Sequence, residues 1–88
     1  MKYVPQLGET EQTSAMDKMI YQRYEIAELD FYWLIAELDR TTNTAFGYAN
    51  LGNDLEAEWG YISIEELLDN GANLVQDWKP CKFGEIKK

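Results

Sequence analysis

Residues 39–44 (DRTTNT) constrain the fold most, because they separate two runs that are rich in apolar and aromatic side chains. Aspartate, asparagine and threonine favour turns through hydrogen bonds to nearby backbone groups, whereas aromatic and β-branched residues favour strands. The pattern predicts a β-hairpin with strands at 32–38 and 45–51. Gly52 and Asn53 indicate a further turn, which leads to a third strand at 59–62.

The sequence changes from a strand period to a helix period at Ser63. Glu66 follows three residues later, as in a capping box, so Ser63 and Glu66 are expected to cap a helix that continues to about residue 70. Gly71 is expected to end this helix in the left-handed conformation, with Leu67 and Leu68 on the buried side.

The remaining segments give weaker signals. Apolar residues in 19–39 recur at helical spacing, but the aromatic run at 31–33 favours strands, so both structures stay open here. We expect a polar arm or a short helix at 1–18, a short edge strand at 74–78 and a tail at 79–88, all within one domain.

The chain has no histidine and one cysteine, Cys81. These counts exclude an intrachain disulfide and the usual zinc ligand sets, so we expect no metal, no cofactor and a reducing, cytoplasmic location. No apolar stretch has the length of a signal peptide or a membrane span. Lys79 and Lys82 flank Cys81 and could lower its thiol pKa, although a passive residue in the tail is the favoured interpretation.

Acidic residues outnumber basic residues by 16 to 8, which gives a net charge of −8. Residues 24–78 hold twelve acidic side chains and one basic side chain, Arg40. This charge disfavours direct binding to nucleic acid or to an anionic membrane, and it favours a basic protein partner. The alternative is that the charge only keeps a small, aromatic-rich protein in solution.

Seven carboxylates are the candidate partner-binding residues, because carboxylates held on a rigid sheet and helix can stand in for phosphates. They are Glu37, Asp39, Glu56, Glu58, Glu65, Glu66 and Asp69. Glu37 and Asp39 fall on one face of a strand, so they could instead hold Mg²⁺ or act as an acid and a base. The sequence lacks the histidine and the phosphate-binding glycine loop that normally support such chemistry, so no catalytic residue is assigned.

Aromatic side chains form a second group of candidate contacts, namely Trp33, Tyr48, Trp59 and Tyr61. Such residues stack on bases in proteins that bind single strands, but here the neighbouring residues are acidic, so core packing or a protein contact is favoured. Ser63 has no histidine that could activate it as a nucleophile, and its capping role explains it.

Four segments, FYWLIAELD, AFGYANL, EWGYISIEELL and a C-terminal stretch with Pro80 and FGEI, resemble in order and spacing the family called domain of unknown function 2958. The resemblance covers residues 19–86. Here Glu58 and Trp59 replace the glutamate and leucine of the family, and the connection after the helix is shortened to NGANLVQD. The resemblance implies an α+β fold in which 19–39 forms strands rather than a long helix. It also implies a gene of plasmids, phages and other mobile elements, and it brings no catalytic residues.

These features predict an α+β fold with a core at 19–78, in which a small antiparallel sheet of three to four strands precedes the capped helix. We expect an acidic interaction protein of a mobile element, not an enzyme, that inhibits a nucleic-acid-binding host defence protein of the CRISPR or restriction type by nucleic-acid mimicry. The second hypothesis is an accessory module of a conjugation or replication system that binds through its aromatic sheet face. A divalent-metal carboxylate enzyme is the third, and the sheet could also form a homodimer through an exposed edge or face.

Overall fold

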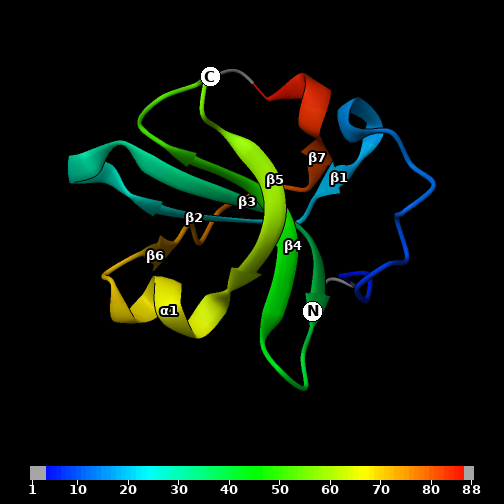
Figure 1. Ribbon diagram of the computed structural model, residues 1–88, viewed down its shortest axis with the longest axis horizontal. Coiled ribbons are helices and arrows are strands. Elements are labelled where there is room, and N and C mark those ends of the chain that lie inside the picture. Colours follow the sequence, from blue (N-terminus) through cyan, green and yellow to red (C-terminus); the bar gives the residue numbers. More distant parts are fainter. Residues whose placement is uncertain (1–3, 87–88) are drawn as a thin grey trace.

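The computed structural model describes residues 4–86 and is dominated by antiparallel β-sheet (Figure 1). A five-stranded sheet has the strand order β5-β4-β3-β2-β6. Its strands are β2 (Gln22–Ile26), β3 (Phe31–Asp39), β4 (Thr44–Leu51), β5 (Glu58–Ser63) and β6 (Asn73–Leu74). The predicted mixed fold, with an antiparallel sheet and few helices, is confirmed. The sheet was predicted to have three to four strands, whereas it has five.

A second sheet, of two strands, pairs two segments that lie far apart in the sequence. In it β1 (Met19–Ile20) pairs antiparallel with β7 (Cys81–Lys82). Three short 3-10 turns lie at Ala15–Asp17 (η1), Ala27–Leu29 (η2) and Phe83–Glu85 (η3). The prediction of a tail at 79–88 is wrong within the described residues, because Phe83 is buried and pairing with β1 holds this segment on the body of the protein.

The region 19–39 forms strands and not a long helix. β2 and β3 pair antiparallel, from Gln22 opposite Ile35 to Ile26 opposite Phe31. Asp30 connects η2 to β3 with a φ of 62°, in the left-handed region that aspartate tolerates better than most residues. The aromatic and β-branched residues of this region therefore take the pleated positions that they favour.

The predicted hairpin is confirmed as β3 and β4, joined by residues 40–43. Trp59 and Tyr61 share one face of β5, where they lie opposite Tyr48 and Phe46 on β4. The predicted edge strand at 74–78 is shorter and begins earlier, since β6 has two residues and pairs with Tyr24 and Glu25 of β2.

A β-bulge at Ala36 changes the face to which the following residues of β3 point. Ile35 lies opposite Gly47, and Glu37 lies opposite the neighbouring residue of β4, Phe46. Ala36, between them, therefore has no residue opposite it on β4. An extra residue in one strand reverses the alternation of side chains beyond it. Glu37 therefore shares a face with Phe46 and Tyr61.

Gly47 permits the close approach of β3 and β4 beside this bulge. A Cβ at this position would lie 2.0 Å from the carbonyl oxygen of Leu34, which is far inside van der Waals contact. Only glycine therefore fits here without a shift of the backbone.

Each face of the five-stranded sheet buries one hydrophobic cluster. The first includes side chains of α1 (Ile64–Asp69) and consists of Val4, Tyr24, Ile35, Leu38, Ala45, Ile62, Ile64, Leu67 and Ala72. The second involves the two-stranded sheet and η3, and consists of Ile20, Leu34, Ala36, Tyr48 and Phe83. We call the first side the helix face and the second side the aromatic face.

The predicted cap of α1 is confirmed for Ser63, whereas the reciprocal bond of a capping box, from the Ser63 N–H to the Glu66 carboxylate, is not found within residues 4–86. The hydroxyl of Ser63 accepts a hydrogen bond from the backbone N–H of Glu66 at 3.3 Å. At the other end Gly71 has a φ of 90°, and its N–H donates to the carbonyl of Leu68 at 3.1 Å. Asn70 is the C-cap of α1, and Gly71 follows it in the left-handed conformation that commonly ends a helix.

Only part of the predicted buried side of α1 is buried. Leu67 lies in the core with Ile64, three residues before it, whereas Leu68 is 52% exposed. Because residues three apart share a face of a short helix, the next residue after Leu67 turns towards solvent. No helix within residues 4–86 has the length and apolar character needed to cross a membrane.

Candidate protein-binding surface

Two adjoining hollows lie on the helix face beside β4 and β5. The larger, of about 270 Å³, is bounded by the sheet and α1 and is lined by Trp33, Ala49, Leu51, Tyr61, Ile62, Ser63, Glu66, Leu67 and Asn70. The smaller, of about 130 Å³, is lined by Ala49, Leu51, Asn53, Glu56 and Glu58. Because Ala49 and Leu51 line both, we treat the hollows as one feature, the acidic groove.

Small residues leave the middle of this face open. Ala49 on β4 lies opposite Glu58 on β5, and two positions along the strands Gly47 lies opposite Gly60. A Cβ built on Gly60 would meet no atom within 4 Å. The sheet surface next to the acidic groove therefore has space for side chains of another molecule.

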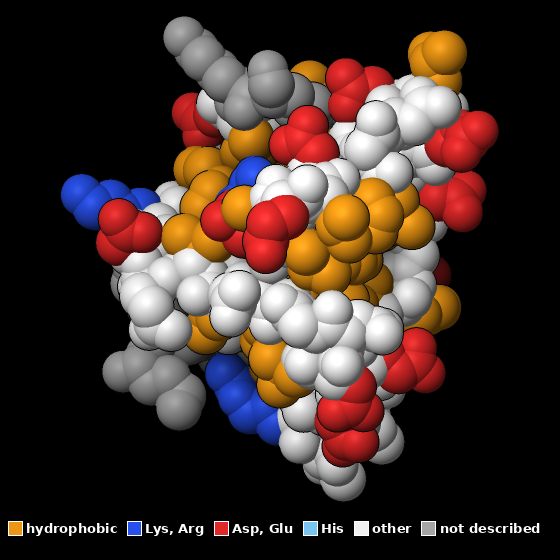
Figure 2. All heavy atoms as spheres, turned by 90° about the vertical axis from the view of Figure 1, so that its left-hand side faces the viewer, with side chains coloured by type: hydrophobic (Ala, Val, Ile, Leu, Met, Phe, Trp, Pro, Cys, Tyr) orange, Lys and Arg blue, Asp and Glu red, His pale blue; other side chains and the backbone are white. Residues whose placement is uncertain are grey.

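Apolar side chains form one wall of the acidic groove. Trp33 is half-buried, and Phe31 lies edge-on to it with a ring distance of 6.3 Å. Leu51 pairs with Phe31 across the strands and is 57% exposed. Figure 2 shows a patch of hydrophobic side chains right of the centre of the face that it views, with acidic side chains above and below the patch. An exposed apolar area with a polar rim is typical of an interaction site.

Three predicted carboxylates line the acidic groove. Glu56 and Glu58 lie where the β4–β5 loop enters β5, and Glu66 lies on the first turn of α1. All three are exposed, and none forms an ion pair with another described residue. They therefore surround the apolar wall with negative charge that no cation of the described chain neutralises.

Glu65 and Asp69 are also exposed on α1, but they do not line the acidic groove. Asp39 has a different role, since its carboxylate accepts hydrogen bonds from the backbone N–H groups of Thr41 at 2.9 Å and Thr42 at 3.4 Å. It stabilises the β3–β4 turn, as aspartate commonly does. The structure thus brings Glu56, Glu58 and Glu66 together and leaves Asp39 apart from them.

Glu37 does not belong to an exposed surface, because its side chain is 3% exposed. One carboxylate oxygen accepts a hydrogen bond from the N–H of Gly8 at 2.7 Å, and the other accepts bonds from the N–H of Thr10 at 3.0 Å and from its hydroxyl. These bonds fix the N-terminal segment against β3. Glu37 was predicted to help to bind a partner through an accessible carboxylate. That prediction is wrong, because the carboxylate is buried and bonded within the chain.

Lys18 completes the surroundings of Glu37. It is buried too, its ammonium group donates to the hydroxyl of Thr10 at 3.0 Å, and it lies 5.8 Å from the centre of the Phe46 ring. Burial alone would raise the pKa of Glu37, but the bonds from Thr10 and Gly8 and the charge of Lys18 outweigh it, so the pKa is lowered. Glu37 and Asp39 do not form a carboxylate pair with free oxygens, and no group of three or more Cys, Asp or Glu within residues 4–86 is placed to hold a metal ion.

The four predicted aromatic contacts do not form one platform. Tyr48 is buried in the core of the aromatic face, where Trp59 also packs, with its ring 4.9 Å from that of Phe83. Tyr61 is 74% exposed, and its ring packs against Phe46 on the same face, although the residue also borders the acidic groove because it lies on the edge strand β5. Trp33 lies on the helix face. Tyr48 is therefore a core residue, and Trp33 and Tyr61 remain accessible on opposite sides of the sheet.

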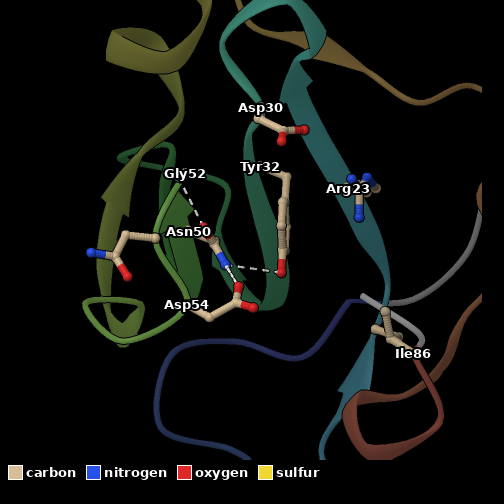
Figure 3. A pocket seen from close by; sticks show the side chains of 8 residues that line it. Arg23, Asp30, Tyr32, Asn50, Gly52, Asp54 and Ile86 are labelled. Atoms are coloured by element: carbon tan, nitrogen blue, oxygen red, sulfur yellow. Dashed lines mark hydrogen bonds between the residues drawn. The ribbon is translucent and has the colours of Figure 1, made fainter.

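No motif in the sequence indicates the role of Asn50, which organises the β4–β5 loop. This side chain is 2% exposed, and it donates hydrogen bonds to Asp54 at 2.6 Å and to the phenol of Tyr32 at 3.2 Å (Figure 3). Its carbonyl oxygen accepts a bond from the N–H of Gly52 at 2.9 Å. Asn50 thereby holds the loop that carries Glu56, and it lines a separate polar hollow of about 450 Å³.

The thiol of Cys81 does not show the lowered pKa that the flanking lysines could have produced. Burial in β7 raises the pKa of its thiol, and the negative charge of Glu85 raises it further. Because a protonated thiol is a poor nucleophile, the raised pKa agrees with the interpretation of Cys81 as a passive residue.

Compared with models of protein families, with curated proteins and with solved structures, the chain has no match.

Proposed function

We propose that the protein binds a basic segment of a partner protein in the acidic groove. The observation that carries this proposal is the combination of Glu56, Glu58 and Glu66 with an exposed apolar wall at one place on the surface. Long cationic side chains suit such a place, because their aliphatic stems cover apolar surface while their charged ends meet carboxylates. Solubility alone requires scattered charge and does not explain the apolar wall.

A more specific form of the proposal is that the partner is a nucleic-acid-binding protein. Glu65 and Asp69 extend the negative surface along α1, and a basic cleft that accepts phosphates also accepts spaced carboxylates. The mobile-element origin expected from the sequence would suit an inhibitor of a CRISPR effector or a restriction enzyme. In the alternative, an accessory module of a conjugation or replication system, accessible aromatic side chains of the sheet such as Trp33 or Tyr61 would make the main contact.

The binding proposal is tested with a defined probe, a fluorescent peptide of twelve residues with six lysines and six leucines. The variant Glu58→Lys/Glu66→Lys is compared with the control Glu11→Lys/Asp77→Lys, which changes the net charge equally at exposed residues outside the acidic groove. We expect the first variant to bind about 100-fold more weakly than the wild type and the control to change affinity less than about fivefold. Equal losses in both variants would mean that only the net charge matters, and the proposal would fail.

The mimicry form is tested by competition. Purified CRISPR effector or restriction enzyme is incubated with labelled duplex DNA, and the protein is added in increasing amounts. We expect the DNA to be displaced, and displacement to fall as ionic strength rises above about 0.1 M, since exposed charges are then screened beyond about 10 Å. Binding to the peptide without displacement of DNA from either enzyme would favour the accessory-module alternative.

A further inference from the structure

The two edges of the five-stranded sheet differ in length and in protection. β6 forms one edge with two residues, whereas β5 forms the other with six, Glu58–Ser63. Natural edge strands are usually protected by lysine, proline, a bulge or a covering segment. β5 has no lysine or proline, and its register with β4 runs without a bulge from Ala49 opposite Glu58 to Thr44 opposite Ser63.

The backbone of β5 is also available for hydrogen bonds along this edge. Apart from its ladder with β4, no backbone group of Glu58–Ser63 bonds to another part of the chain within residues 4–86. Within residues 4–86, the one hydrogen bond of β5 outside this ladder is accepted by the side chain of Ser63 as the cap of α1. A row of unpaired N–H and C=O groups is a template for an additional strand.

We propose that the basic partner segment binds as an extended strand that pairs with the outer edge of β5, beside the acidic groove. This inference rests on the proposed function and adds the mode of binding. Alternate side chains of an added strand point to opposite faces. On the helix face they meet Glu58 and the open space over Gly60, and on the aromatic face they meet the exposed ring of Tyr61.

Charge decides what kind of strand fits this edge. A lysine or arginine on the helix face reaches the carboxylates of the acidic groove, and an apolar residue on the other face covers Tyr61. The matching sequence therefore alternates cationic and apolar residues. A second copy of this chain fits poorly, because pairing β5 with β5 would bring two acidic grooves together, each on a molecule with a net charge of −8.

Two peptides of identical composition test the mode of binding. One alternates lysine and leucine over twelve residues, and the other places the same residues at a helical period. We expect the alternating peptide to bind about tenfold more tightly. Methylation of the peptide's backbone nitrogens that would donate hydrogen bonds to β5, which are every second one, should remove this preference. Equal binding of both peptides would overturn the strand proposal and leave the proposed function in place, whereas binding of neither would overturn both.

Hydrogen–deuterium exchange locates the contact. We expect the amides of β5 to gain protection when the alternating peptide is added, while those of α1 change little. The variant Tyr61→Lys places a protective lysine on the edge and should weaken binding about tenfold, and Tyr61→Phe should leave it unchanged. Circular dichroism establishes that both variants fold, and protection of α1 without β5 would mean that the peptide lies in the acidic groove as a helix instead.

Discussion

Glu37 and Glu58 are carboxylates of the same sheet that serve different purposes. Glu37 is buried, and every oxygen of its side chain accepts hydrogen bonds from the N-terminal segment. Glu58 is exposed at the acidic groove and makes no ion pair with another described residue. Some acidic residues of a sequence therefore stabilise the fold, whereas others stay accessible to a partner. Only the structure shows to which group a given residue belongs.

The largest expected effect concerns the glycine pair Gly47 and Gly60, which lie opposite each other. Gly47→Ala should lower the free energy of unfolding by about 3 kcal/mol or more, because its Cβ would collide with the backbone of Leu34. Gly60→Ala should change it by less than about 0.5 kcal/mol, since a Cβ there meets no atom. Urea denaturation measures both. A similar cost for the two substitutions would contradict the placement of the bulge.

Glu37→Ala comes next in size. It should lower the free energy of unfolding by about 3 kcal/mol, because the N–H groups of Gly8 and Thr10 lose a charged acceptor and Lys18 loses a nearby negative charge. Glu58→Ala is the matched control and should cost less than about 0.5 kcal/mol. If denaturation curves of the two variants coincide, the distinction between buried and available carboxylates is lost.

Asn50→Ala should have a smaller effect, about 2 kcal/mol, because the phenol of Tyr32 and the N–H of Gly52 lose a buried partner. The loss should appear as faster hydrogen exchange in the β4–β5 loop. Leu55→Ala, at a residue of the same loop that is 95% exposed, serves as the control. Unchanged exchange in Asn50→Ala would mean that this side chain does not hold the loop.

The pH dependence of stability isolates the contribution of Glu37. Its pKa in the folded protein lies below the ordinary value of 4.5, so its ionised form stabilises the fold fully above that value, and this contribution is lost as the pH falls through the folded pKa. The difference in free energy of unfolding between the wild type and Glu37→Gln should thus be constant from pH 7 to about 5 and shrink below that. A difference that grows on acidification would reverse the assigned sign.

The local structure of residues 39–71 could be predicted, because its signals act over a few residues. Turn chemistry at Asp39 and the cap at Ser63 each depend on neighbours three positions away or fewer. The long-range features could not be predicted in the same way. The bulge at Ala36 depends on the pairing of β3 with β4. The burial of Phe83 depends on the pairing of β1 with β7, which lie about 60 residues apart in the sequence.

The candidate surface was predicted in part for the same reason. Charge counting identified Glu56, Glu58 and Glu66, whose exposure follows from a loop and a helix turn. It also included Glu37, because an alternating strand pattern carries no information on which segment covers a given face. Asn50 was missed because a polar residue in a strand looks like a solvent-facing position until Asp54 and Tyr32 are placed around it.

The central claim is that the exposed carboxylates of the acidic groove bind a basic segment and the buried carboxylate does not. The most direct measurement is a titration of the alternating lysine–leucine peptide into the wild type, Glu58→Lys/Glu66→Lys and Glu11→Lys/Asp77→Lys at equal ionic strength. We expect Glu58→Lys/Glu66→Lys to lose about 100-fold in affinity and the control to change less than about fivefold, while all three proteins melt at similar temperatures. Retained affinity in Glu58→Lys/Glu66→Lys, with the fold intact, would contradict it.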